Sequence, residues 1–150
     1  MNSAIILAAG TGTRFDSEIP KQFTYLKNDK CMIVEHSIMQ FCNHKNIDEV
    51  ILMVPHLDWS NKIQKEYERA NYGNALKKLK YAQGGDSRSE SSKRGLYQCN
   101  ENCNNVLIHD AARPFITREF IDDALFYLDK FDAAIPTINC DDSLINGETL

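Results

Sequence analysis

Short apolar runs alternate along the chain with segments in which apolar residues recur at helical spacing. The runs are 4–7, 50–54, 79–82, 106–108 and 133–138. Apolar runs of this length are typical of strands that are buried on both faces of a parallel sheet. We therefore expect five strands.

Between these runs, apolar side chains fall on one helical face, as in helices that lie on a sheet. They are Val34, Ile38, Phe41 and Cys42; Ile63, Tyr67 and Ala70; and Ile121, Ala124, Leu125 and Leu128. Ser87 and Glu90 form a capping-box pattern that begins a further helix, and Thr117 caps the last helix, with Ile116 before it as part of a hydrophobic staple. This alternation predicts an α/β fold, a Rossmann-like and mainly parallel sheet with helices on both faces, in one domain over residues 1–150.

Composition narrows the function classes. At 150 residues the chain is the size of one domain and can bury a real core, and its net charge of −4 is mild. No basic excess points to nucleic acid, so we expect any anion-binding site to be local. No apolar run approaches the roughly 18 residues that span a bilayer, and no charged-then-apolar leader begins the chain. We expect no membrane partner and a soluble, cytoplasmic protein.

The cysteines and histidines lack a metal or disulfide pattern. The cysteines are an odd number, which fits reduced thiols; they are Cys31, Cys42, Cys99, Cys103 and Cys140. The close pair, Cys99 and Cys103, lacks the second pair or nearby histidine that a zinc site needs. His36 and His44 have no partners at metal spacing, and we expect each at the surface or as a helix cap.

The segment after the first strand carries a candidate anion site. Gly10 and Gly12 let the backbone turn and approach an anion, because neither has a Cβ. Phe15 stands where a dinucleotide fingerprint needs its third glycine, and no Walker Gly-Lys-Ser/Thr follows. Two cations, Arg14 and Lys21, remain. We interpret the segment as a triphosphate cradle, although a plain strand-turn-helix junction with surface cations would show the same glycines.

Two later segments also follow predicted strands. Gly84-Gly85-Asp86 precedes the capped helix, whose free N–H groups favour an anion or a polar ligand edge. Asp110 follows the run 106–108, at the sheet edge where ligands bind, and a carboxylate beside a polyphosphate suits Mg²⁺. From these segments alone, a well-capped helix and a turn aspartate remain alternatives.

Four motifs together resemble the sugar-phosphate cytidylyltransferase family, which implies a GT-A-like nucleotidyltransferase fold. They are Ala8-Ala9-Gly10-Thr11-Gly12-Thr13-Arg14; Pro20-Lys21-Gln22-Phe23; Gly84-Gly85-Asp86 with Arg88 and Ser91; and His109-Asp110-Ala111-Ala112-Arg113-Pro114. Their order and spacing are similar to those of the family over nearly the whole chain. The resemblance is strongest to the branch that uses methylerythritol phosphate in non-mevalonate isoprenoid synthesis.

The resemblance implies that CTP and a polyol phosphate give a CDP-polyol and pyrophosphate, with Mg²⁺ as the cofactor. It assigns catalysis to Arg14 and Lys21; nucleotide binding to Ala8, Ala9, Gly10, Thr11, Gly12, Gly85, Asp86 and Ser91; the metal to Asp110; and acceptor binding to Arg113, Asp142 and Ser143. Arg113 matches the motif with either a binding or a structural role. Ser143 stands where the family has threonine, so it keeps the hydroxyl and loses the methyl group.

Two other interpretations stay open. Relatives that use ribitol phosphate share the glycine loop and Pro-Lys-Gln, although many differ at Ala112. The second interpretation is a nucleotide-binding module without turnover. In the family, the fifth strand leads into a dimerisation arm and a further phosphate-binding segment, and neither follows Leu150. We expect the sequence to be a fragment of a protein that forms a homodimer.

Overall fold

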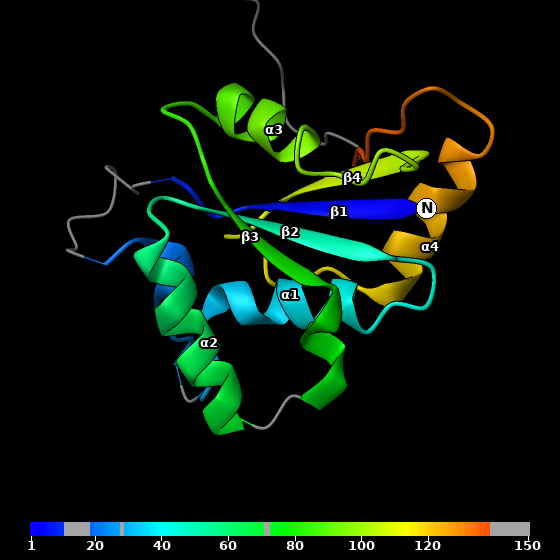
Figure 1. The fold of residues 1–150 in the computed structure, drawn as a ribbon. Helices are drawn as coiled ribbons and strands as arrows, with labels where there is room; N and C mark the ends of the chain where they lie inside the picture. Colours follow the sequence, from blue (N-terminus) through cyan, green and yellow to red (C-terminus); the bar gives the residue numbers. More distant parts are fainter. Residues whose placement is uncertain (11–18, 28, 71–72, 139–150) are drawn as a thin grey trace, which may run out of the picture.

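Four parallel strands form one sheet in the computed structural model, which describes residues 1–10, 19–27, 29–70 and 73–138. The strands are β1 (Asn2–Leu7), β2 (Glu49–Val54), β3 (Leu79–Gln83) and β4 (Asn105–Asp110). Their order is β3-β2-β1-β4 (Figure 1). In the described part of the chain, β1 and β2 therefore lie in the middle of the sheet, and β3 and β4 lie at its edges.

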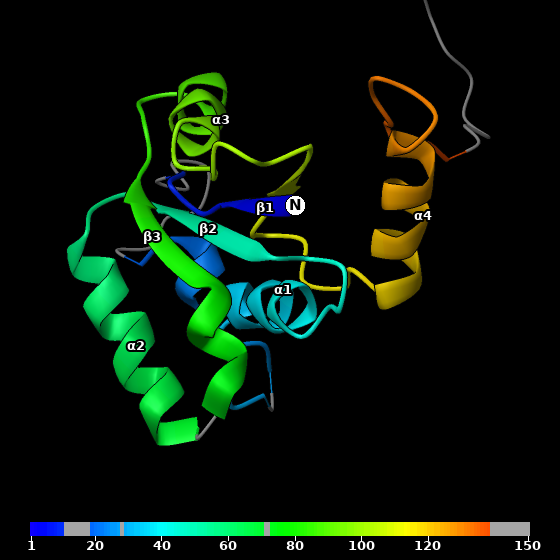
Figure 2. The same ribbon diagram turned by 45° about the vertical axis from the view of Figure 1, so that its right-hand side comes forward.

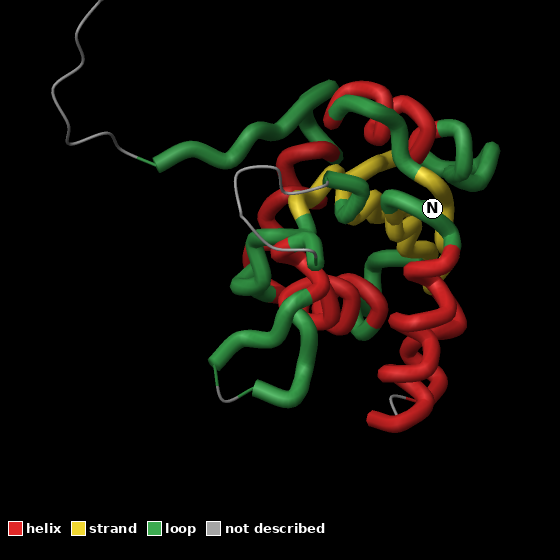
Figure 3. The backbone as a smooth tube through the Cα atoms, turned by 90° about the vertical axis from the view of Figure 1, so that its left-hand side faces the viewer, coloured by secondary structure: helices red, strands yellow, loops and turns green. Residues whose placement is uncertain are grey.

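Helices cover both faces of this sheet. They are α1 (Ile33–Cys42), α2 (Asp58–Ala70), α3 (Arg88–Leu96) and α4 (Arg118–Leu128), with two short 3-10 helices, η1 (Lys21–Phe23) and η2 (Gly73–Lys78). α3 lies on one face, α1 and α2 lie on the other, and α4 packs beside β4 (Figures 1 and 2). Seen from the side, the strands form a single layer between helices (Figure 3). The predicted α/β class, with a parallel sheet and helices on both faces, is confirmed.

Alternation of side chains along the central strands explains their unbroken apolar runs. Ala4 and Ile6 join the larger core cluster with α1, whereas Ile5 and Met53 join the smaller cluster on the α3 face. All four are fully buried, because a central strand has a helical layer on each side. An added Cβ at Gly95 would lie 2.7 Å from Ile5 Cγ2, so glycine lets α3 lie directly on β1.

The predicted fifth strand is wrong. Residues 133–138 have no strand structure and are exposed throughout, with Ile135 82% and Ile138 94% exposed. An apolar run becomes a strand only where neighbouring strands pair with its backbone and cover its side chains. The described part of the sheet ends at β4, and no strand within it pairs with this segment.

His44 was predicted at the surface or as a helix cap, but it is buried. This residue follows α1 and is 1% exposed, with its Nε2 3.3 Å from Asp122 Oδ1 on α4. Its Nδ1 accepts a hydrogen bond from the Asn46 amide at 3.3 Å. His36 is partly exposed, and its Nε2 lies 2.9 Å from Asp29 Oδ2. Both histidines therefore have structural carboxylate neighbours.

The described cysteines are free thiols in different environments. Cys42 lies in the core, where burial raises the pKa of its thiol to about 12. Cys31, Cys99 and Cys103 are partly exposed, and Cys140 lies outside the described residues.

Within the described ranges, none of the helices combines the length and the apolar character that crossing a bilayer requires.

Candidate active site

The candidate site lies where the strand order reverses. From β1 the chain moves to β2 and β3 on one side, whereas β4 pairs with β1 on the other side. Ligands of open α/β sheets bind outside the carboxyl ends of the strands at such a switch point. Leu7 pairs with Asp110 there, and the Ala111 amide donates to the Leu7 oxygen at 3.1 Å. The segments that follow β1 and β4 therefore leave the sheet side by side.

The segment after β1 begins the site. The amide of the buried Ala8 donates to the Met53 oxygen at 2.9 Å. An added Cβ at Gly10 would meet no described protein atom within 4 Å, so this position faces open space. Gln22 Nε2 donates to the carbonyl oxygens of Ala8 and Gly10, at 2.6 and 2.8 Å. A side chain from η1 thus holds the start of the loop.

Lys21 stands on a braced turn. It is exposed and begins η1 after Pro20, whose backbone is extended (φ −57°, ψ 138°). The amide and the hydroxyl of Thr24 donate to the Lys21 carbonyl oxygen, at 3.1 and 2.7 Å. The adjacent Phe23 ring stacks on Trp59 of α2, with 4.1 Å between ring centroids. These contacts fix the backbone from which the Lys21 ammonium extends.

The segment after β3 lies against the first loop. The Gly84 amide donates to the Val54 oxygen at 2.9 Å. An added Cβ at Gly84 would lie 2.1 Å from Ala9 Cβ, so only glycine lets the two segments come this close. The buried Ser91 hydroxyl accepts from the Gly85 amide at 3.0 Å and donates to the Gly85 oxygen at 3.3 Å. Ser91 therefore holds the shape of this turn.

The start of α3 differs in one bond from the predicted capping box. Ser87 Oγ accepts from the Glu90 amide at 3.0 Å, as predicted. The Glu90 carboxylate, however, accepts from the Asp86 amide at 3.0 Å, one residue earlier than the box requires. This bond, followed by the Arg94 guanidinium at 2.6 Å, lowers the pKa of Glu90. Arg94 also donates to the Gly84 oxygen at 2.6 Å, which ties α3 to the turn.

Asp110 ends β4, and each of its carboxylate oxygens faces an arginine. Oδ1 lies 3.1 Å from Arg88 Nε, and Oδ2 lies 3.5 Å from Arg113 Nε. The Asp110 side chain is 31% exposed. A single accessible carboxylate fits Mg²⁺, which takes its remaining ligands from water and substrate phosphates. The described ranges hold no group of three or more His, Cys, Asp or Glu that could bind a metal ion.

His109, beside Asp110, fastens the loop after β4. Its Nε2 lies 3.0 Å from the Arg113 oxygen and 3.1 Å from Ser37 Oγ on α1. A carbonyl oxygen only accepts, so Nε2 must carry a hydrogen for the Arg113 bond. Burial lowers the pKa of His109, although the Arg113 carbonyl and the Asp110 charge act in the opposite direction. The imidazole therefore favours its neutral form at this position.

The structure brings the described candidates to one edge of the sheet. These are Ala8, Ala9, Gly10, Lys21, Gly85, Asp86, Ser91, Asp110 and Arg113. The remaining candidates lie outside the described residues: Thr11, Gly12, Arg14, Asp142 and Ser143. The sequence pattern indicates no role for Gln22, Ser37 or Arg94. For Arg94 the spacing of four residues from Glu90 was an available signal, whereas the other two contact groups that are distant in sequence.

Comparison with known proteins gives one consistent result. A family model described as 2-C-methyl-D-erythritol 4-phosphate cytidylyltransferase (IspD) matches residues 2–149. The protein of that name from Clostridium botulinum (strain 657 / Type Ba4) is 38% identical over 133 residues, which cover 89% of this chain and 56% of the relative. The one from Caldicellulosiruptor bescii is 35% identical over 143 residues, covering 94% and 59%.

A solved structure agrees with these sequence matches. The 4-diphosphocytidyl-2C-methyl-D-erythritol synthase of Anaerococcus prevotii DSM 20548 is similar with a TM-score of 0.68 and 28% identity. The match covers 86% of this chain and 51% of that structure. The chain thus spans little more than half the length of the relatives it matches.

Proposed function

The chain belongs to the 2-C-methyl-D-erythritol 4-phosphate cytidylyltransferase family, and on that premise we propose that its site joins CTP to 2-C-methyl-D-erythritol 4-phosphate. The products are CDP-methylerythritol and pyrophosphate. The observation that carries the proposal is the convergence of the glycine turn, the braced Lys21 and the Asp110 carboxylate at one edge of the sheet. Because the chain spans 56% of its Clostridium botulinum relative, the proposal for turnover concerns the full-length protein.

The proposed transfer takes place at the α-phosphorus of CTP. A phosphate oxygen of the acceptor forms a new P–O bond there, and the P–O bond to pyrophosphate breaks. Negative charge grows on the leaving group, and no covalent bond to the protein is needed. Positioning and preorganised cations then lower the barrier. We assign these cations to Lys21 and Arg14.

Nucleotide recognition belongs, in this proposal, to the two segments that meet at Ala9 and Gly84. We assign backbone contacts with the nucleotide and its phosphates to residues 8–12, as the family resemblance implies. Gly85 and Asp86 are assigned to the cytosine edge by family resemblance, on the turn that the Ser91 hydroxyl holds. Their N–H groups already donate to Ser91 and Glu90, so we assign the contacts with the base to their carbonyl oxygens, which accept. A fixed polar edge rejects bases that cannot match it.

Mg²⁺ is the metal that we propose, with Asp110 as its protein ligand. When bound, the ion supplies positive charge to the triphosphate. We predict that Asp110→Asn raises the Mg²⁺ concentration needed for half-maximal turnover, because an amide oxygen is a weaker ligand than a carboxylate. A metal titration of the full-length protein measures this, with the exposed Asp123→Asn as the control. An unchanged titration in Asp110→Asn would leave Asp110 only its ion pairs with Arg88 and Arg113.

We assign binding of the acceptor phosphate to Arg113, Asp142 and Ser143, on the basis of family resemblance.

We further propose that the full-length protein is a homodimer, as the resemblance implies, and that it resides in the cytoplasm. Free thiols in the described residues suit a reducing compartment. Sedimentation and fractionation test these two statements.

A turnover assay tests the proposed reaction. Full-length protein is incubated with CTP, Mg²⁺ and 2-C-methyl-D-erythritol 4-phosphate, and pyrophosphate release is measured. Ribitol 5-phosphate in place of the acceptor tests the alternative polyol. Binding of CTP without pyrophosphate release from either acceptor would indicate a nucleotide-binding module and contradict the proposal.

A further inference from the structure

Gln22 ties together the two ends of the segment between β1 and η1. Its side chain is buried, with only 6% of the residue exposed. The chain leaves the sheet through Ala8 and Gly10 and returns at Lys21. Gln22 Nε2 donates to the oxygens of Ala8 and Gly10, at 2.6 and 2.8 Å. A carboxamide nitrogen carries two hydrogens, so both are used in these two bonds.

We propose that Gln22 is a positioning residue of the nucleotide site, and that it turns the amides of the first loop toward the triphosphate. This inference rests on the proposed function. The C=O and N–H groups of a trans peptide unit point in opposite directions. Because the Ala8 carbonyl oxygen accepts from Gln22, the N–H group of the same peptide unit, which belongs to Ala9, points away from Gln22. Without these bonds, carbonyl oxygens could face the phosphates and repel them.

Gln22 also sets the position of Lys21 relative to the loop. The two residues are adjacent in η1, whose backbone is fixed by the Phe23 amide bond to the Pro20 oxygen at 2.9 Å. The Phe23 ring stacks on Trp59 with 12° between the ring planes. A change at residue 22 therefore acts on the phosphate-binding backbone and on the Lys21 ammonium together.

The chemistry at this position requires a neutral group with two donors. Glutamate has the same shape, but an ionised carboxylate cannot donate and would face two carbonyl oxygens. Methionine has similar length and no donor. Both substitutions leave the Ala8 and Gly10 carbonyls without this partner. Ala8 is buried, and a buried polar group without a partner costs free energy.

Binding of CTP and CMP to the full-length protein tests the inference. Trp59, the single tryptophan in the 150 residues, stacks on the ring of Phe23, which directly follows Gln22. Its fluorescence is therefore the signal used to follow binding. We expect Gln22→Met and Gln22→Glu to raise the Kd for CTP roughly tenfold or more, the effect of losing hydrogen bonds to buried groups. The Kd for CMP should rise much less, because CMP lacks the β- and γ-phosphates.

Matched variants separate positioning from simple destabilisation. Gln40→Met and Gln40→Glu, on the exposed face of α1, should leave both Kd values unchanged. Thermal unfolding of every variant confirms that the titrations are made on folded chain. If Gln22→Met does not fold, Gln22→Glu still tests the inference, because protonation of its new carboxyl restores one donor. Its CTP affinity should then recover as the pH falls toward the ordinary carboxyl range of about 4–5.

The outcomes are distinguishable. Equal loss of CTP and CMP affinity, or CTP affinity within twofold of wild type in a folded Gln22→Met chain, would overturn the positioning role and leave the proposed function standing. A wild-type full-length protein that binds no CTP would overturn the proposed function and this role with it. A selective loss of CTP affinity that Gln22→Glu regains at low pH supports both.

Discussion

At the scale of single residues, neighbouring groups orient the Asp110 carboxylate and hold the backbone of Lys21. Asp110 faces Arg88 and Arg113 from different segments. The backbone of Lys21 is held through Thr24. Electrostatic catalysis depends on such preorganisation, because charges that are already in place need not reorganise as the reaction proceeds.

We predict that Lys21→Ala lowers kcat by on the order of 10²-fold, the loss seen when a preorganised charge is removed from a transition state. The KM for CTP should change less. Steady-state turnover of the full-length protein measures both parameters, with the exposed Lys27→Ala as the control. A raised KM with an unchanged kcat would mean that Lys21 binds ground state and transition state equally.

His109 gives stability a pH dependence of defined sign. Burial lowers its pKa in the folded chain below the ordinary value of 6.5. Between these two pKa values the unfolded chain binds more protons, so the free energy of unfolding falls as the pH drops below about 6.5. We predict that His109→Gln, whose amide can still donate to the Arg113 oxygen, flattens this part of the profile.

Denaturant unfolding at a series of pH values measures the effect. His36, His44 and His56 also lie near carboxylates, so the informative quantity is the difference between wild type and variant. A difference that does not vary with pH would show that His109 contributes no proton linkage.

At the scale of elements, glycines decide which segments can touch. Gly95 lets α3 lie on β1, and Gly84 lets the turn after β3 lie against Ala9. Gly10 is different, because a side chain there would meet no described protein atom within 4 Å. Gly95 and Gly84 therefore allow close packing between segments, whereas the absence of a side chain at Gly10 leaves space beside the loop.

Two alanine substitutions separate these uses of glycine. Gly84→Ala places a Cβ 2.1 Å from Ala9 Cβ and should lower the free energy of unfolding by roughly 1–3 kcal/mol, as overpacking does. Gly10→Ala should leave stability nearly unchanged and weaken CTP binding, because its Cβ projects into the space we assign to phosphate. Urea unfolding and CTP titration of both variants test this. Equal stability losses, or a Gly10→Ala chain that binds CTP normally, would contradict it.

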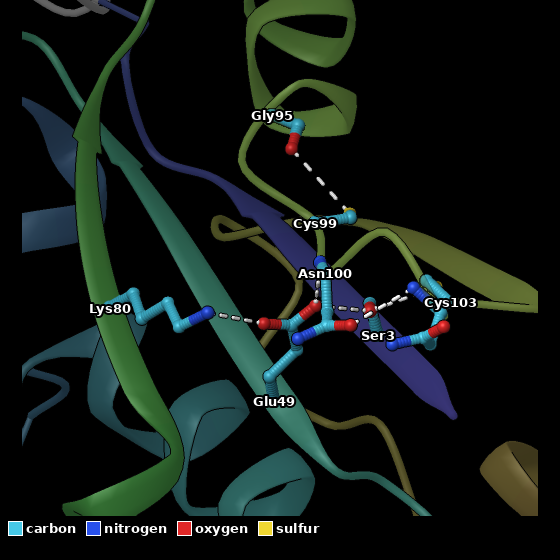
Figure 4. Close-up of polar contacts among 8 residues, drawn as sticks. Ser3, Glu49, Lys80, Gly95, Cys99, Asn100 and Cys103 are labelled. Carbon is cyan, nitrogen blue, oxygen red and sulfur yellow. Dashed lines mark hydrogen bonds and ion pairs between the residues drawn. The ribbon is translucent and has the colours of Figure 1, made fainter.

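At the scale of the whole molecule, a buried carboxylate connects segments at the amino ends of the strands, opposite the site. Glu49 begins β2 and accepts from Ser3 Oγ at 2.6 Å, the Asn100 amide at 2.7 Å and Lys80 Nζ at 2.6 Å (Figure 4). These partners come from β1, the loop before β4, and β3. Burial by itself would raise the pKa of Glu49, but the bonds from Lys80, Ser3 and Asn100 outweigh it, and the pKa is lowered.

We predict that Glu49→Gln lowers the free energy of unfolding at neutral pH by about 1.5–3 kcal/mol, the range for hydrogen bonds to a charged group. Lys80 is half exposed and contributes little of this. The stabilisation is present above the ordinary pKa of 4.5 and is lost as the pH falls through the lowered pKa of the folded chain. The difference between variant and wild type should therefore shrink in acid.

Unfolding curves at neutral and acid pH check this prediction, with the exposed Glu101→Gln as the control. CTP binding should be unchanged in folded Glu49→Gln, because the carboxylate lies at the amino end of β2 and the site at the carboxyl ends. A difference that stays constant as the pH falls would mean that the charge of Glu49 is not what stabilises these segments.

The sequence by itself determined strands β1 to β4, helices α1 to α4 and the family of this chain. The runs that became β1 and β2 are apolar at every position of 4–7 and 50–54, and that pattern exists only because both faces of a central strand are covered. Ser87 and Thr117 cap their helices as predicted, since capping depends on residues three positions apart. Motif order and spacing likewise required no knowledge of packing.

Only the tertiary structure decided what lies against what. The run 133–138 has the same local pattern as a strand, but no described strand pairs with it. Gln22 holds carbonyls that lie 14 and 12 residues away, and Arg88 meets Asp110 across 22 residues. Local periodicity carries no information about such partners, because hydrogen bonds and burial depend on which distant segments the chain brings together.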